Sequence, residues 1–228
     1  FRIREVGLIK MSKKVSISKY IAYLFLIVLC VIWVIPVVFG ITTSFRSQTE
    51  VVSSGFRLFP KEWIFENYVA ILENTSTAPI LRWLFNSVFI AVSHTLLVIV
   101  IISITGYGYS RMNFKGRDTL FFTLLGISFF PGVVNIIPSY KIIDAFGWVN
   151  TSWAMIIPGL AGMGNIFLVR QFMKGIPGEL DESARVDGAG DFRIYFSIIL
   201  PLIKPVLIVC GLFSFVGSWN DFLWPVIV

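Results

Sequence analysis

The chain has 228 residues, of which 56% are hydrophobic and only 14% are charged, and its formal net charge is +6. Soluble domains carry roughly a quarter charged residues, so this composition excludes an ordinary soluble enzyme or binding module. A mean hydropathy of +0.82 and several long charge-free runs indicate an integral membrane protein. Basic residues report topology first in such a protein, so the positive charge does not indicate a nucleic-acid partner.

Residues 1–19 form a basic N-terminal tail in which Glu5 is the single acid. The apolar run over 20–45 is too long for the core of a signal peptide, and no small-residue cleavage site follows it. We therefore predict an uncleaved first span over 20–45. The longest polar segment, 46–82, comes next, and we expect an extracytoplasmic loop with a short interfacial helix near Glu66–Glu73.

Four further apolar segments predict membrane spans, at 83–110, 119–140, 145–169 and from Pro205 onward. Prolines interrupt several of the five spans, at Pro36, Pro131, Pro138 and Pro158. Such breaks either free backbone groups to line a cavity or simply kink the helix. The predicted fold class is an all-α polytopic transmembrane helix bundle over residues 20–228. We expect a sixth span that this chain lacks, because the sequence stops without a charged flank.

The distribution of basic residues predicts the orientation of the bundle. Most lysines and arginines lie in the tail, in the loop after the second span and in the loop after the fourth. By the positive-inside rule these segments face the cytoplasm, and the segments around 46–82 and Lys141 face outward. The N-terminus is therefore expected in the cytoplasm, together with the loop over 170–204.

The segment 176–205 is the only long non-apolar stretch in the second half of the chain. Residues Glu179–Asp187 are rich in helix formers, with Pro177 placed for a first helical turn. Gly188 can adopt a positive φ and break the helix, and Asp191 can cap a second short helix. The stretch therefore predicts a helix–turn–helix loop that docks on something outside the membrane.

The spacing in this loop resembles the EAA loop of ABC importer permeases, with the pattern E-A-A-x3-G-x9-I-x-L-P. The single departure is Ser183 in place of the middle alanine. The resemblance implies that the loop over 170–204 is a coupling helix seated in a cleft of a cytoplasmic ATPase. The residues that it implies for ATPase coupling are Glu182, Ser183, Ala184, Asp187, Gly188, Ile198, Leu200 and Pro201.

The resemblance extends over most of the chain. The chain is similar to the carbohydrate branch of these permeases, in particular to the maltose-type subunit without a large periplasmic insertion. The segments that carry it are 63–68, 135–140, 150–153, 167–172 and 218–225. It implies a multi-pass protein of the bacterial inner membrane that imports sugars, in particular oligosaccharides. The implied partners are a second permease, two ATPase subunits that bind the ATP, and an external sugar-binding protein.

Two other functions stay open at this point. One is a permease for another solute, such as amino acids or peptides, which the EAA loop alone does not exclude. The other is a membrane enzyme or scaffold with no transport role. We find no nucleophile–base set, carboxylate pair, phosphate-binding loop or metal-ligand spacing in the sequence, so we expect neither a catalytic site nor a cofactor.

Polar residues within the apolar segments are costly and usually face a bundle interior or a wet path. We assign Asn86, His94 and Asn165 to hydrogen bonds between helices, as polar residues commonly supply in bundles. The candidate translocation path consists of Asn135, Tyr140, Trp219, Asn220 and Asp221, because aromatic faces, amides and carboxylates suit a sugar. Interfacial anchoring by Trp219 and an inter-subunit ion pair at Asp221 are the structural alternatives.

Overall fold

The computed structural model describes residues 17–53, 55, 57–73 and 77–228. Within these ranges every regular element is helical and no strand is present, which confirms the predicted all-α class. The first sixteen residues of the predicted basic tail lie outside the described residues. The chain divides into two compact units, residues 1–80 and 81–228, and each is described by itself below.

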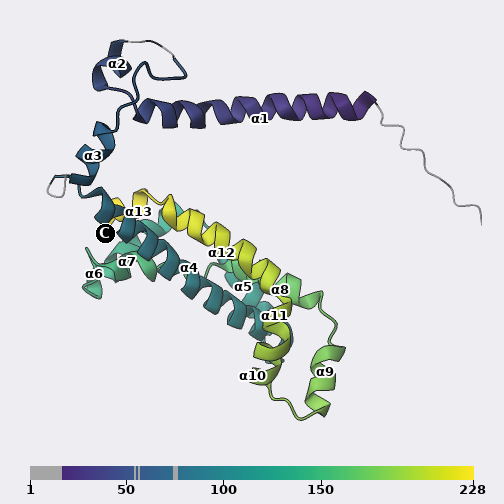
Figure 1. Ribbon diagram of the computed structural model, residues 1–228. Helices are drawn as coiled ribbons and strands as arrows, with labels where there is room; N and C mark the ends of the chain where they lie inside the picture. Colours follow the sequence, from purple (N-terminus) through teal and green to yellow (C-terminus); the bar gives the residue numbers. More distant parts are fainter. Residues whose placement is uncertain (1–16, 54, 56, 74–76) are drawn as a thin grey trace, which may run out of the picture. The chain divides into compact units, whose positions relative to one another are not determined.

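The first unit is built on one long apolar helix, α1 (Ile17–Ser44), shown in purple in Figure 1. Pro36 lies inside α1 without ending it, so the interruption predicted there does not occur. Two short helices follow, α2 (Gln48–Ser53) and α3 (Glu66–Glu73), and α3 coincides with the helix predicted from the sequence.

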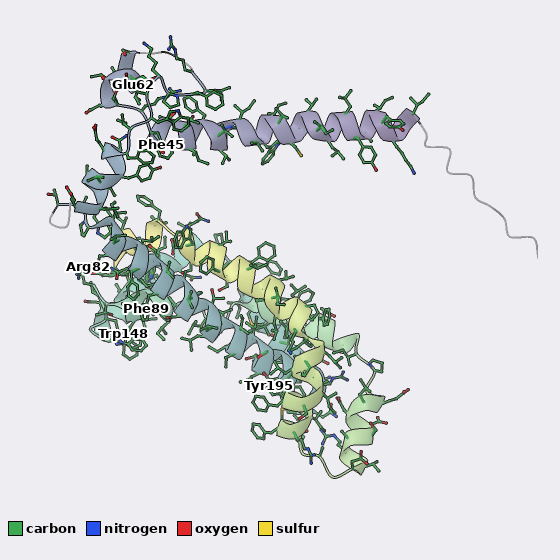
Figure 2. The ribbon with its side chains drawn as sticks, in the orientation of Figure 1. Phe45, Glu62, Arg82, Phe89, Trp148 and Tyr195 are labelled. Carbon is green, nitrogen blue, oxygen red and sulfur yellow. The ribbon has the colours of Figure 1, made fainter. Side chains whose placement is uncertain are left out.

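Phe45 organises the end of α1. Its ring lies 5.4 Å from the ring of Trp63, 5.3 Å from that of Phe65 and 5.2 Å from that of Tyr68 (Figure 2). The amide of Asn67 donates to the carbonyl of Ser44 at 2.9 Å and to that of Arg46 at 2.8 Å. Carbonyls at a helix C-terminus have no partner within the helix, so these bonds join α3 to the end of α1.

The second unit contains α4 (Ile80–Arg111), α5 (Arg117–Ile127), the 3₁₀ turn η1 (Gly132–Asn135) and α6 (Ile136–Ala145). The segment predicted as the third span bends by 92° between α5 and the η1–α6 pair, which places the break at Pro131 as expected. Pro138 does not break a helix, because it lies in the first turn of α6, where a missing N–H costs little.

The segment 145–169 is not one helix. It contains α7 (Ser152–Ile156) and the start of α8 (Met163–Lys174), with Pro158 and Gly159 between them, and Gly159 has a φ of +79°. Among the described residues, three helices are long and apolar enough to cross a membrane, or four if the bent pair counts as one span. This is fewer than the five spans predicted, because the 145–169 run is broken into pieces too short to cross.

Three helices of the second unit, α4, α8 and α12 (Lys204–Trp219), pack closely. The chain ends in the short helix α13 (Leu223–Ile227). In Figure 1, α4 and the yellow α12 run side by side, and a Cβ atom built on Gly211 of α12 would lie 2.9 Å from Ile99 of α4. A Cβ on Gly106 of α4 would lie 2.7 Å from Val169 of α8. Both glycines therefore permit a helix approach that alanine would obstruct.

Candidate functional site

The loop between α8 and α12 begins with the eight-residue helix α9 (Glu179–Val186). Pro177 precedes this helix, whose N-cap is Gly178, so it does not occupy the first turn as predicted. Helix α9 ends in a Schellman motif: Ala189 N–H donates to the Ala184 carbonyl at 2.9 Å, and Gly188 N–H to the Arg185 carbonyl at 3.0 Å. Gly188 has a φ of +81°, as its place in the sequence predicts.

The chain then continues through α10 (Asp191–Ile194), the π turn η2 (Tyr195–Ile199) and α11 (Leu200–Leu202) into α12. The predicted second helix is therefore present, but Gly190 is its N-cap and Asp191 is its first residue. The Asp191 carboxylate instead forms an ion pair with the Arg185 guanidinium, which raises the pKa of Arg185. A charge-assisted bond to an arginine competes successfully with a neutral backbone cap.

The residues assigned to ATPase coupling fall into two groups in the structure. Glu182, Ser183, Asp187, Gly188 and Pro201 are exposed, whereas Ala184, Ile198 and Leu200 are half-buried and pack against the core of the unit. The first group lies at the surface of the loop, and the second packs against the core through small or apolar side chains.

Two further side chains of this loop are apolar and strongly exposed. Val186 at the end of α9 is 88% exposed, and Phe192 in α10 is 82% exposed. Exposed apolar side chains grouped on a polar loop are typical of an interaction site. The motif spacing could not identify them, because both lie between its fixed positions.

A cavity of about 400 Å³ opens in the second unit, beside the middle of α4, where His94 and Val98 line it. Its lining includes Asn135 and Asp221 of the candidate path, whereas Tyr140, Trp219 and Asn220 are not among the described residues that line it. Trp219 stacks on Phe215 with ring centroids 5.9 Å apart, and the Asn220 amide donates to the carbonyl of Val216 at 2.9 Å.

Several polar side chains join Asn135 and Asp221 in this cavity. They are His94, Ser139, Asn165, Ser214 and Ser218. His94 and Asn165 were assigned to contacts between helices, and His94 serves both roles, because its Nδ1 lies 2.8 Å from the Ile156 carbonyl of α7. Asn86 does not belong to the described lining.

Two polar groups of the cavity lining differ in their hydrogen bonding. The buried Ser214 hydroxyl has no hydrogen-bond partner among the described residues, which leaves it available to a bound polar group. Trp224 donates its indole N–H to the Ala154 carbonyl at 2.8 Å, so its ring is fixed at the cavity wall. A hollow lined by amides, hydroxyls, one carboxylate and one indole can bind a polar, uncharged solute.

Comparison with known proteins matches residues 7–228 to the model of the family described as "Binding-protein-dependent transport system inner membrane component". The chain belongs to this family. The match covers both the polar cavity and the α9–α10 loop. The chain is therefore a permease subunit of a binding-protein-dependent ABC importer and a protein of the inner membrane. A permease subunit is a transport component and not an enzyme.

Individual relatives agree with the predicted resemblance to carbohydrate permeases. The chain is 33% identical over 208 residues to the diacetylchitobiose uptake system permease protein NgcG of Streptomyces coelicolor, covering 90% of this chain and 68% of the relative. It is 30% identical to the arabinooligosaccharides transport system permease protein AraQ of Bacillus subtilis, covering 97% and 79%. It is 32% identical to the maltodextrin transport system permease protein MdxG of Bacillus subtilis, covering 91% and 73%.

A solved structure supports the fold. A chain of a bacterial ABC transporter involved in the import of the acidic polysaccharide alginate superposes with a TM-score of 0.80, at 23% identity, covering 93% of this chain and 74% of that chain. The family implies three kinds of partner: an ATPase, a substrate-binding protein and a second permease.

Proposed function

We propose that the chain moves saccharides, in particular oligosaccharides, across the inner membrane, with α9 and α10 seated on a partner ATPase. The observation that carries the coupling is the α9 helix itself. It projects exposed side chains at Glu182, Ser183 and Asp187, and a Schellman turn at Gly188 fixes its end. The implied assembly contains two ATPase subunits, a second related permease and an external sugar-binding protein.

The polar cavity supports a saccharide as the solute. Its amides and hydroxyls match the donors and acceptors of sugar hydroxyl groups, and the Trp224 ring supplies an apolar wall. We infer that Asn135 and Asp221 border the path. Tyr140 on α6 remains a proposed member of the path, as do Trp219 and Asn220 at the C-terminal end of α12.

The proposed orientation places the N-terminus and the loop over 170–204 in the cytoplasm. The transmembrane domain then covers residues 20–228, with residues 1–19 as a cytoplasmic tail. The basic residues around α9 support this orientation by the positive-inside rule. The proposed docking supports it independently, since a cytoplasmic ATPase must reach α9.

Reconstitution tests the proposed function directly. The chain is co-expressed with its partner permease and ATPase, purified, placed in lipid vesicles and supplied with ATP and the external binding protein. We expect ATP-dependent uptake of neutral oligosaccharides. Uptake of amino acids or peptides without saccharide uptake would establish the alternative solute class, and failure of the chain to co-purify with an ATPase would refute the coupling.

A further inference from the structure

Arg111, the last residue of α4, joins three helix ends. Its Nη2 donates to the Met173 carbonyl at 3.2 Å and to the Ile176 carbonyl at 2.8 Å, at and just beyond the C-terminus of α8. The Met173 carbonyl also accepts the Ile176 N–H at 3.1 Å, so Arg111 adds a second donor to it. A cation at this place opposes the negative end of the α8 dipole. Arg111 Nε lies 3.3 Å from Oδ2 of Asp181, in the first turn of α9.

Arg170 of α8 makes the reciprocal arrangement. Its Nε donates to the Tyr109 carbonyl in the last turn of α4 at 3.2 Å, and its Nη2 pairs with Asp118 in the first turn of α5. The guanidinium carbon lies 4.0 Å from the centroid of the Phe121 ring. Each arginine therefore binds a carbonyl at the end of the other helix and then an acid in the helix that follows.

The two halves of this arginine clasp, defined as Arg111, Asp181, Arg170 and Asp118, differ in burial. The Arg170 side chain is fully buried, so its half locks α4 to α8 as part of the core. The Arg111 and Asp181 side chains are 12% and 14% exposed and lie at the base of α9. The Arg111 half is thus a polar connection between α9 and a transmembrane helix.

Helix α4 carries this connection to the cavity. The helix runs without interruption from Ile80 to Arg111, and His94 and Val98 on it line the cavity. At the helical rise of about 1.5 Å per residue, His94 lies roughly 25 Å along the axis from Arg111. If α9 moves and Arg111 moves with it, helix α4 therefore transmits the movement to the cavity wall.

The geometry of the Arg111–Asp181 pair allows the contact to persist while α9 changes its direction relative to α4. Arg111 Nε and Asp181 Oδ2 lie 3.3 Å apart as an ion pair, and Nε makes no aligned hydrogen bond to a described residue. The other carboxylate oxygen, Asp181 Oδ1, is also buried without a hydrogen-bond partner among the described residues. A charge pair tolerates changes of direction that a directional hydrogen bond does not. The Arg185–Asp191 pair, by comparison, joins α9 only to its neighbour in sequence.

We propose that the Arg111–Asp181 pair is the positioning contact that makes α4 follow α9 when the ATPase moves the loop. Arg111 and Asp181 are positioning residues in this role, and neither touches the solute. The inference rests on the proposed docking of α9 on an ATPase.

The test compares Asp181→Asn, Arg111→Gln and Arg111→Lys with a matched control, Lys115→Gln. Lys115 is exposed, lies four residues beyond Arg111 and forms no ion pair in the described part of the chain. Each variant is purified with its partners and reconstituted. Four quantities are measured: recovery of the ATPase in the complex, the melting temperature, ATP hydrolysis and saccharide uptake.

We expect Asp181→Asn and Arg111→Gln to assemble and hydrolyse ATP normally while the saccharide imported per ATP falls about fivefold or more. Arg111→Lys keeps the positive charge but loses the planar guanidinium with its several N–H donors. Its saccharide imported per ATP should lie between the values of Arg111→Gln and wild type. Lys115→Gln should match wild type. If Asp181→Asn imports as much saccharide per ATP as wild type, the inference is overturned. It is also overturned if the variant fails to assemble or melts at a lower temperature, because the pair would then only stabilise the fold. Saccharide uptake by the wild-type complex tests the proposed function, and that result does not depend on the behaviour of the variants.

Discussion

The left-handed residue at the end of α9 offers the sharpest test of the docking loop. Gly188 has a φ of +81°, and no described atom lies within 4 Å of a Cβ built on it. A substitution there meets no steric obstacle from neighbouring groups, so its whole cost comes from the backbone. The left-handed conformation costs about 1–2 kcal/mol for an ordinary L-residue, and a β-branched residue is disfavoured further.

For Gly188→Val we therefore expect a cost of about 2 kcal/mol or more, which is roughly a 30-fold shift of a local equilibrium. An isolated helix as short as α9 is marginal in water, so this cost is comparable to what holds the helix end in place. The two hydrogen bonds of the Schellman motif should break, and the coupling surface should lose its fixed orientation.

The assay measures saccharide uptake, membrane level of the chain and recovery of the ATPase. Gly188→Val should reach the membrane at a normal level, because the turn lies outside the packed helices, but should lose coupled uptake or ATPase binding. Gly188→Asn should be much milder, since asparagine tolerates positive φ.

Gly190→Ala is the matched control. Gly190 has a φ of −78° and a ψ of 169°, which any residue adopts, and no described atom lies within 4 Å of its Cβ position. This variant should import normally. Normal uptake in Gly188→Val, or an equal defect in Gly190→Ala, would refute the reasoning.

Three further predictions concern topology, the cavity and the loop. In a variant without the two native cysteines, a cysteine at 186 should be labelled only from the cytoplasm and one at 57 only from outside; reversed labelling would overturn the proposed orientation. Asp221→Asn keeps size but removes the only carboxylate of the described cavity lining, so uptake should fall while the complex assembles normally; unchanged uptake together with unchanged thermal stability would contradict both the path and the ion-pair interpretation. Arg185→Glu should repel Asp191 and impair uptake, and Asp191→Lys in the same chain should restore it; a double variant no better than the single one would show that the pair does not hold α9 to α10.

Local features of the chain were predictable from the sequence because they depend on short-range patterns. Long apolar runs fix α1, α4 and α12, since a charge-free run forms a helix wherever its backbone groups cannot reach water. The helix at Glu66–Glu73 was also predictable, and so was the end of α9 at the glycine at 188. The spacing of the EAA motif was sufficient to indicate the family.

Tertiary structure decided which side chains meet. Nothing in the sequence relates Arg111 to Ile176, 65 residues away, or Arg170 to Asp118, 52 residues away, because only the close packing of α4 on α8 brings those helix ends together. Asp191 was predicted as a cap from its position alone, but the fold of the turn brought Arg185 within reach of it. The cavity lining was only partly predictable. A polar residue in an apolar helix is expected to face other helices, whether it bonds to them or lines a cavity. Only the packing of the helices determines which of the two occurs.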